Sequence, residues 1–213
     1  MNIIEKSSNG IFQISGDAKL MSNRKVFIEG EITPETACEF VKKIMILNMQ
    51  DPDRPIDLLI NTPGGCINSG MVYYDVIQAS KAPIRTFCIG RAYSMGAILL
   101  ACGNHGRYIL PHGEVMIHEP LLGNHVSGNS SSINSISESL LETKRKMNQI
   151  LAKHTGQTEE TVEKATGYDH YFSAEESRNF GLVDEIIDFG RLLEECEWIV
   201  QREWFLETIA FTA

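Results

Sequence analysis

The sequence lacks the features that mark membrane-spanning and polyanion-binding proteins. Its longest apolar stretch, residues 95–102, is far shorter than the roughly 20 residues that cross a bilayer. Basic residues form no block, and 19 Lys and Arg are outnumbered by 28 Asp and Glu, so the formal net charge is −9. A chain of this charge pattern is a poor ligand for nucleic acid or for an anionic lipid surface. The sequence therefore predicts neither nucleic acid nor membrane as a partner.

Paired cysteine motifs are also missing. The five cysteines are scattered, and an odd number without C-x-x-C spacing fits neither a disulfide framework nor a zinc site. The pattern is typical of small buried side chains in a reducing compartment. The first residues, MNIIEKSSNG, become polar too soon to form the apolar core of a signal peptide. We therefore expect a cytoplasmic protein.

The patterns that are present indicate an α/β fold. Apolar residues recur with helical spacing over 34–49, after Thr33 as N-cap and Pro34 at the first helical position. Alternating strands and helices predict a largely parallel sheet. We expect strands at 26–28, 56–60, 84–89, 108–110, 115–117 and 182–187. We expect further helices at 67–80, 95–102 and 133–154, from 158, and from the capping box that begins at Ser173 until Gly181.

Two strand-to-helix junctions could carry chemistry. Residues 61–65 (NTPGG) are expected to form a turn whose adjacent glycines let a substrate approach main-chain N–H groups. In residues 90–97 (GRAYSMGA), small side chains flank Ser94 where a strand leads into an apolar helix. A hydroxyl there lies at the positive end of the helix, which favours an alkoxide or an oxyanion. The segment is similar to the nucleophile elbow of hydrolases, although Ala92 replaces its first glycine, and a plain N-cap role for Ser94 is the alternative.

A nucleophilic serine needs a general base, and the base needs an acid that orients it. Among the six histidines, His118 directly follows the apolar strand 115–117, so its position would be fixed. Asp169 is the acidic residue of the aromatic segment 167–172, and we expect it to be buried and ionised against a histidine. Three other acidic residues remain alternatives: Asp184, Asp188 and Glu119.

Four motifs occur in one order along the chain: TPGG at 62–65, SMGA at 94–97, MIHEP at 116–120, and FSAEE at 172–176 with GLVD at 181–184. Together they resemble the proteolytic subunit of the Clp protease, a serine peptidase of the ClpP/crotonase superfamily. The resemblance implies an α/β fold of repeated ββα units with a protruding long helix for ring–ring contact. It also implies a ClpP-like serine peptidase domain at 25–188, preceded by a flexible segment 1–24 and followed by an extension 189–213.

The same resemblance implies the catalytic roles. Ser94 would be the nucleophile, His118 the general base and Asp169 the acid that orients it. The main-chain N–H groups of Gly65 and Met95 would form the oxyanion hole. Such an enzyme needs no metal or organic cofactor, and its substrates are peptides or unfolded polypeptides cleaved inside a closed ring chamber.

Members of this family stack two seven-membered rings through a long helix and the Gly-rich strand before it. Residues 133–154 and 121–130 correspond to those elements, so we expect a homo-oligomer. Gly167 and Tyr168 stand where the family often carries an acid–Arg pair that links the rings, so that link is absent here.

The family is normally fed by an AAA+ unfoldase, which docks in pockets lined by aromatic residues. Here Asp57 and Leu59 stand where two tyrosines are usual, and Ala79 stands where an aromatic residue is common. A carboxylate in an apolar pocket opposes docking because it must be desolvated. We therefore expect weak binding of a standard Clp ATPase.

Proteins of other classes share parts of this pattern. A crotonase-type acyl-CoA enzyme uses the same fold and paired N–H groups but does not need the Ser94, His118 and Asp169 set. A catalytically silent ring subunit would only support an active paralogue. The signal-peptide-peptidase branch, which uses a Ser–Lys pair, is disfavoured by His118 and by the lack of a membrane segment.

Overall fold

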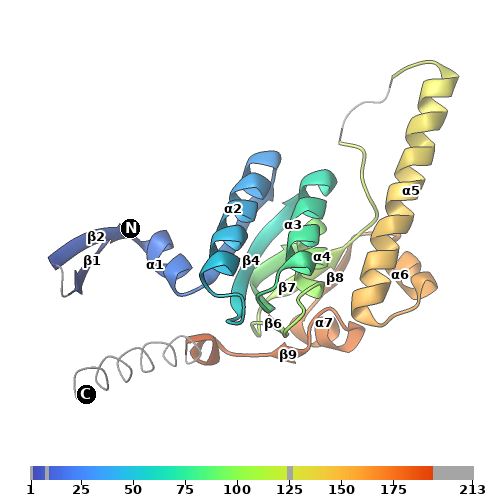
Figure 1. The fold of residues 1–213 in the computed structure, drawn as a ribbon. Coiled ribbons are helices and arrows are strands. Elements are labelled where there is room, and N and C mark those ends of the chain that lie inside the picture. The colour runs from blue at the N-terminus through green and yellow to red at the C-terminus, as the bar shows by residue number, and fades with distance from the viewer. Residues whose placement is uncertain (1, 8–9, 124–126, 194–213) are drawn as a thin grey trace.

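The computed structural model describes residues 2–7, 10–123 and 127–193 (Figure 1). The strands are β1 (Asn2–Ser7), β2 (Gly10–Ser15), β3 (Lys25–Ile32), β4 (Ile56–Gly65), β5 (Ile84–Tyr93), β6 (Arg107–Ile109), β7 (Glu114–Ile117), β8 (His170–Phe172) and β9 (Glu185–Ile186). The helices are α1 (Gly16–Ser22), α2 (Pro34–Gln50), α3 (Ile67–Ala79), α4 (Met95–Ala101), α5 (Ser130–Thr155), α6 (Glu159–Thr166) and α7 (Ala174–Phe180).

The largest sheet has seven strands in the order β3-β4-β5-β6-β9, with β7 also paired to β5 and β8 paired to β7. Its ladders are parallel except the one between β7 and β8. β5 pairs with β6 through its first half and with β7 through its second half, which follows Gly90. The predicted α/β fold with a largely parallel sheet is confirmed.

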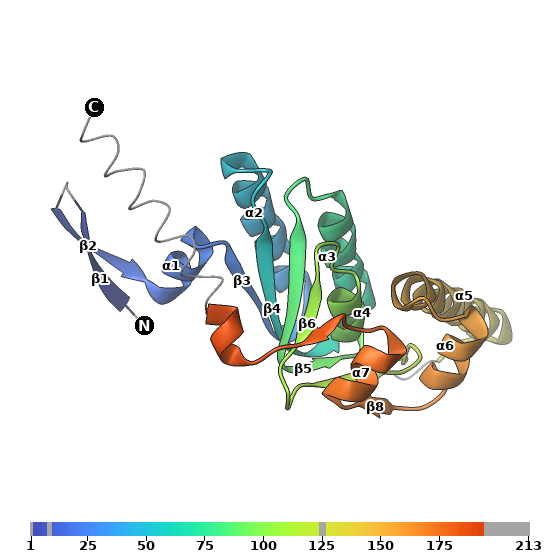
Figure 2. The same cartoon turned by 90° about the horizontal axis from the view of Figure 1, so that it is seen from below.

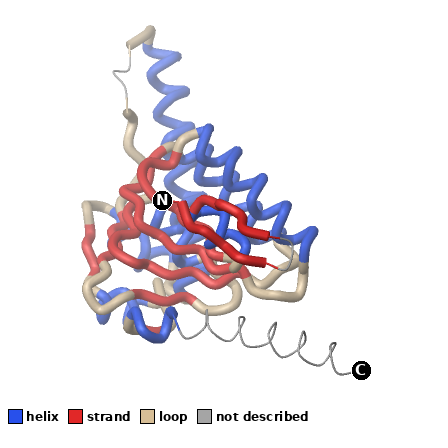
Figure 3. Tube along the Cα trace, turned by 90° about the vertical axis from the view of Figure 1, so that its left-hand side faces the viewer, coloured by secondary structure: helices blue, strands red, loops and turns tan. Residues whose placement is uncertain are grey.

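The sheet is covered on both faces, which explains why residues 56–60 at the start of β4 are all buried. On one face, Ile56, Leu58 and Ile60 are fully buried in the main core, against which the helices pack. Figure 3 shows the helices gathered on one side of the strands. On the other face, Leu59 packs in a second cluster with Leu192, from the segment that follows β9 and lies in front of the strands in Figure 2.

Local sequence signals set the helix ends as expected. Thr33 and Ser173 each form a capping box with the residue three positions later. Gly156 and Gly181 end α5 and α7 in the left-handed conformation, with φ of 72° and 90°. α5 begins at Ser130, three residues before the expected start, because Asn129 accepts a hydrogen bond from Ser132 N–H. Figure 1 shows this helix reaching well beyond the sheet.

Several expected elements differ in the structure. Residues 61–65 continue β4 rather than forming a turn, because Glu31 and Ile32 of β3 pair with Gly64 and Gly65 beyond a bulge. The segment before residue 25, to which no element was assigned, holds the β1–β2 hairpin and α1. The strand expected within 121–130 is absent from 121–123 and 127–129, and the rest of it lies outside the described residues.

The prediction that the cysteines are buried is wrong in part. Cys88 and Cys102 are buried as expected, but Cys38 and Cys66 are exposed. The fifth cysteine, Cys196, belongs to the part of the extension, 194–213, that lies outside the described residues.

The expectation that Asp57 places an uncompensated carboxylate in a docking pocket is wrong. Its residue is 3% exposed, and it accepts hydrogen bonds from Arg85 Nε at 2.6 Å and from the ammonium group of Lys25. Leu59 is also buried, in contact with the segment after β9, whereas Ala79 is exposed at the end of α3. The charge of Asp57 is therefore matched within the sheet and does not face a guest.

Candidate active site

Ser94 lies at the junction between β5 and α4, in a backbone conformation that L residues rarely adopt. Its φ is 55° and its ψ is −120°. Strain of this kind persists only where the surroundings hold it. Here Ser94 N–H donates to Met116 O at 2.8 Å, and Gly64 leaves the room beside it, since a Cβ there would lie 2.8 Å from Ser94 Cβ. The elbow predicted from the sequence is therefore present without the usual first glycine.

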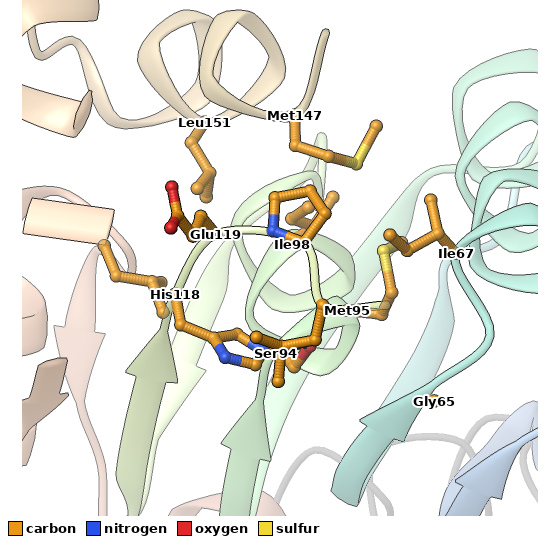
Figure 4. A pocket seen from close by; sticks show the side chains of 12 residues that line it. Gly65, Ile67, Ser94, Met95, Ile98, His118, Glu119, Met147 and Leu151 are labelled. Atoms are coloured by element: carbon orange, nitrogen blue, oxygen red, sulfur yellow. Dashed lines mark hydrogen bonds between the residues drawn. The ribbon is translucent and has the colours of Figure 1, made fainter. Parts of the chain in front are cut away.

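His118 reaches Ser94 because β7 runs beside β5. The register pairs Tyr93 with Met116, so the residues that follow each strand emerge side by side. The Nε2 atom of His118 lies 2.8 Å from Ser94 Oγ, a hydrogen-bonding distance. Figure 4 shows the imidazole ring directed at the Ser94 side chain.

Asp169 is brought to the other side of His118 by the antiparallel pairing of β8 with β7. Ile117 pairs with His170, so the next residues along, His118 and Asp169, face each other. His118 Nδ1 lies 3.2 Å from Asp169 Oδ1, but the two groups are not aligned for a hydrogen bond, and the buried Nδ1 makes none. Catalytic hydrogen bonds are often poorly aligned in the free enzyme and tighten around the substrate.

The environment of Asp169 differs from the expectation. Its side chain is 59% exposed rather than buried, because β8 lies at the edge of the sheet. An exposed carboxylate has fewer neighbours to hold it in one orientation than a buried one, which fits its imperfect alignment with His118.

The three alternative acids are engaged elsewhere. Asp184 accepts a hydrogen bond from Arg107 N–H at 2.9 Å, and the Arg107 guanidinium beside it lowers the pKa of that carboxyl group. Asp188 accepts from Arg191 N–H at 2.8 Å, and Glu119 lies 2.9 Å from Lys144. None of these pairings leaves the carboxylate facing His118.

Gly65 and Met95 lie around the same cavity as Ser94 and His118. Gly65 has a φ of 146°, and a Cβ there would come within 2.4 Å of Ile32 O, so only glycine fits beside β3. Met95 is the first residue of α4, where main-chain N–H groups have no partner inside the helix. Donors of this kind stabilise an oxyanion when they are aimed at the reacting carbonyl.

The cavity beside Ser94 has a volume of about 170 Å³ and an apolar floor. Besides the residues already named, its lining comprises Ile67, Ile98, Ile117, Glu119, Pro120, Leu121, Met147 and Leu151. Met147 and Leu151 come from α5, and the sequence analysis did not assign them to the site (Figure 4). Their four-residue spacing places them on one face of the long helix, but only the packing of α5 shows which surface that face covers.

Within the ranges that the structure describes, no group of three or more His, Cys, Asp and Glu side chains is placed to hold a metal ion. In the same ranges, no helix has the length and apolar content needed to cross a membrane.

The family model described as Clp protease matches residues 9–189. The chain belongs to the Clp protease family. Membership supports a peptidase of the ClpP kind, from a family that generally forms oligomeric rings and binds peptide substrates. The match begins at residue 9, inside the segment 1–24 that the sequence analysis set apart from the peptidase domain.

Proposed function

We propose that this chain is a serine endopeptidase with Ser94 as nucleophile, His118 as general base and Asp169 as orienting acid. The observation that carries the proposal is the 2.8 Å contact between His118 Nε2 and Ser94 Oγ at a strained strand-to-helix junction. A nucleophile and a base within hydrogen-bonding reach, with a third group beside the base, are the recognisable geometry of this chemistry.

In the proposed reaction, Ser94 Oγ attacks a peptide carbonyl while its proton passes to His118 Nε2. The N–H groups of Gly65 and Met95 hold the oxygen of the tetrahedral intermediate. His118 then gives the proton to the leaving amine, and an acyl-enzyme remains on Ser94. Water repeats the sequence on the acyl-enzyme and frees the carboxyl product, while Asp169 stabilises the imidazolium form of His118 at each stage.

The cavity next to Ser94 supports a preference for apolar substrates. Ile98, Met147 and Leu151 offer a carbon-lined space that one apolar side chain of a bound peptide would fill. Burying such a side chain contributes roughly 1.5–3 kcal/mol to binding. We expect that side chain to belong to the residue on the acyl side of the cleaved bond.

We further propose that the protein works as a ring assembly, with two stacked rings of seven copies and α5 at the ring–ring contact. Ile133 and Leu141 of α5 are 47% and 58% exposed, so each leaves apolar surface that another copy of the chain would cover. An unfoldase partner would feed polypeptide to the chamber. Native mass measurement tests this proposal, and a monomer at micromolar concentration contradicts it.

Covalent labelling tests the catalytic proposal. A fluorophosphonate probe should modify Ser94 in the purified protein, and Ser94→Ala should lose both labelling and cleavage of a fluorogenic peptide while keeping its assembly size. Hydrolysis that persists in Ser94→Ala would remove Ser94 from the mechanism. A protein that is neither labelled nor active would instead favour an accessory ring subunit or a crotonase-type acyl-CoA enzyme.

A further inference from the structure

One member of a charged pair lines the cavity beside the proposed catalytic base. Glu119 directly follows His118 and lines the cavity, and its Oε2 lies 2.9 Å from Lys144 Nζ on α5. Glu119 N–H also donates to Thr166 O, the last residue of α6, at 2.8 Å. Lys144 lies 3.5 Å from a second carboxylate, Glu163 of α6. Both the main chain and the side chain of Glu119 are therefore held in place.

Lys144 belongs to the face of α5 that builds the cavity. It precedes Met147 by three positions and Leu151 by seven, so the three side chains lie along one side of the helix. Its side chain is 24% exposed, and hydrogen bonding to Glu119 raises its pKa, so it stays cationic at neutral pH. In Figure 4, the Glu119 side chain extends toward Leu151 and away from Ser94.

The charge of the cavity depends on Glu119. Among the described residues that line it, Glu119 carries the only carboxylate. A free carboxylate in a mostly apolar cavity would attract the ammonium or guanidinium group of a substrate side chain. Lys144 would weaken that attraction, because its ammonium group already pairs with Glu119 and would repel a second cation.

We propose that Lys144 is a specificity-determining residue, which withholds the Glu119 carboxylate from the substrate and so excludes basic side chains from the cavity. The inference rests on the proposed peptidase function and deepens it, because it names the substrate side chains that the cavity accepts and rejects. The substrate residue whose side chain enters the cavity is the one on the acyl side of the cleaved bond.

Two peptides that differ only at that residue, leucine in one and lysine in the other, test the inference. The wild-type protein should cleave the leucine peptide with the higher kcat/KM. Lys144→Met should raise the lysine-to-leucine ratio of kcat/KM by about fivefold, the size expected for a partly solvated charge pair. Because both peptides meet the same His118, a change in the base alters both rates alike and cancels in the ratio.

Two further variants separate the local effect from general ones. Lys146→Met removes the same charge from an exposed position on α5 and should leave the ratio unchanged. Glu119→Gln combined with Lys144→Met should abolish the gain, because the carboxylate that attracts lysine is gone. The gain in Lys144→Met should also shrink as salt is raised, since salt screens partly exposed charges.

A ratio in Lys144→Met that equals the wild-type ratio would overturn the inference, as would a gain that survives in the double variant. Fluorophosphonate labelling of Ser94 in the same samples tests the peptidase proposal separately. Labelled, active protein with an unchanged ratio would leave that proposal standing and remove only the role of Lys144. Protein that is unlabelled and cleaves neither peptide would overturn both.

Discussion

His118 Nε2 lies 2.8 Å from Ser94 Oγ although 24 positions separate the two residues in the chain. Main-chain contacts fix both partners, because Ser94 N–H donates to Met116 O and β7 pairs in register with β5. The pair therefore depends on the sheet rather than on loops. A nucleophile and base held in this way need little reorganisation before reaction.

The strained conformation of Ser94 makes a prediction about stability. Ser94→Gly should be more stable than Ser94→Ala by about 1 kcal/mol, because glycine adopts a φ of 55° without the cost that a Cβ carries. Thermal unfolding of the two inactive variants measures the difference. If Ser94→Ala were the more stable of the two, the junction would not be strained.

Asp169 and Asp184, which directly precede β8 and β9, should separate catalysis from stability. Asp169→Asn should keep the fold and reduce turnover by about 10⁴-fold, as for triads in which the histidine tautomer is disturbed. Asp184→Asn should keep most of the turnover but unfold more easily, because Asp184 binds Arg107 through several hydrogen bonds. Peptide cleavage and thermal unfolding of both variants check this, and the reverse pattern would make Asp184 the acid.

The buried pair of Asp57 with Lys25 should be costly to break. Asp57→Asn leaves Lys25, whose side chain is 4% exposed, without its counter-charge, and we expect a loss of about 3–5 kcal/mol in the free energy of unfolding. Glu39→Gln, which breaks the exposed pair with Lys42, is the matched control and should change stability little. Equal effects of the two changes in denaturant unfolding would contradict the burial of Asp57.

Stability should fall at mildly acidic pH because of His154. Burial, followed by the nearby charges of Lys153 and Arg107, lowers the pKa of His154 to about 4. The folded protein then binds fewer protons than the unfolded chain, whose histidine titrates near 6.5. The stability that neutral His154 contributes is therefore fully present above pH of about 6.5, and it is lost progressively as the pH falls toward about 4.

His154→Gln removes this titration and should flatten the decline in unfolding temperature between those pH values. His105→Gln, a change in a histidine for which no role is proposed, serves as the comparison and should leave the decline as it is in the wild-type protein. An unchanged slope in His154→Gln would show that other groups cause the acid sensitivity.

The sequence by itself determined most of the elements after residue 25 and their order. Thr33, Ser173 and Gly181 act within one turn of the chain, so their capping roles can be recognised without knowing the fold. The α/β alternation and the motif around Ser94 are equally local. These features led to the family that the match over residues 9–189 shows.

Tertiary structure decided what each residue faces. The pairing of β8 with β7 sets Asp169 opposite His118 yet leaves it exposed, and the packing of α5 brings Lys144 and Met147 to the site. Asp57 meets Lys25 only because β3 and β4 lie side by side, 32 positions apart in the chain. Burial and charge pairing arise from contacts between distant segments, and no local pattern of residues encodes which segments will meet.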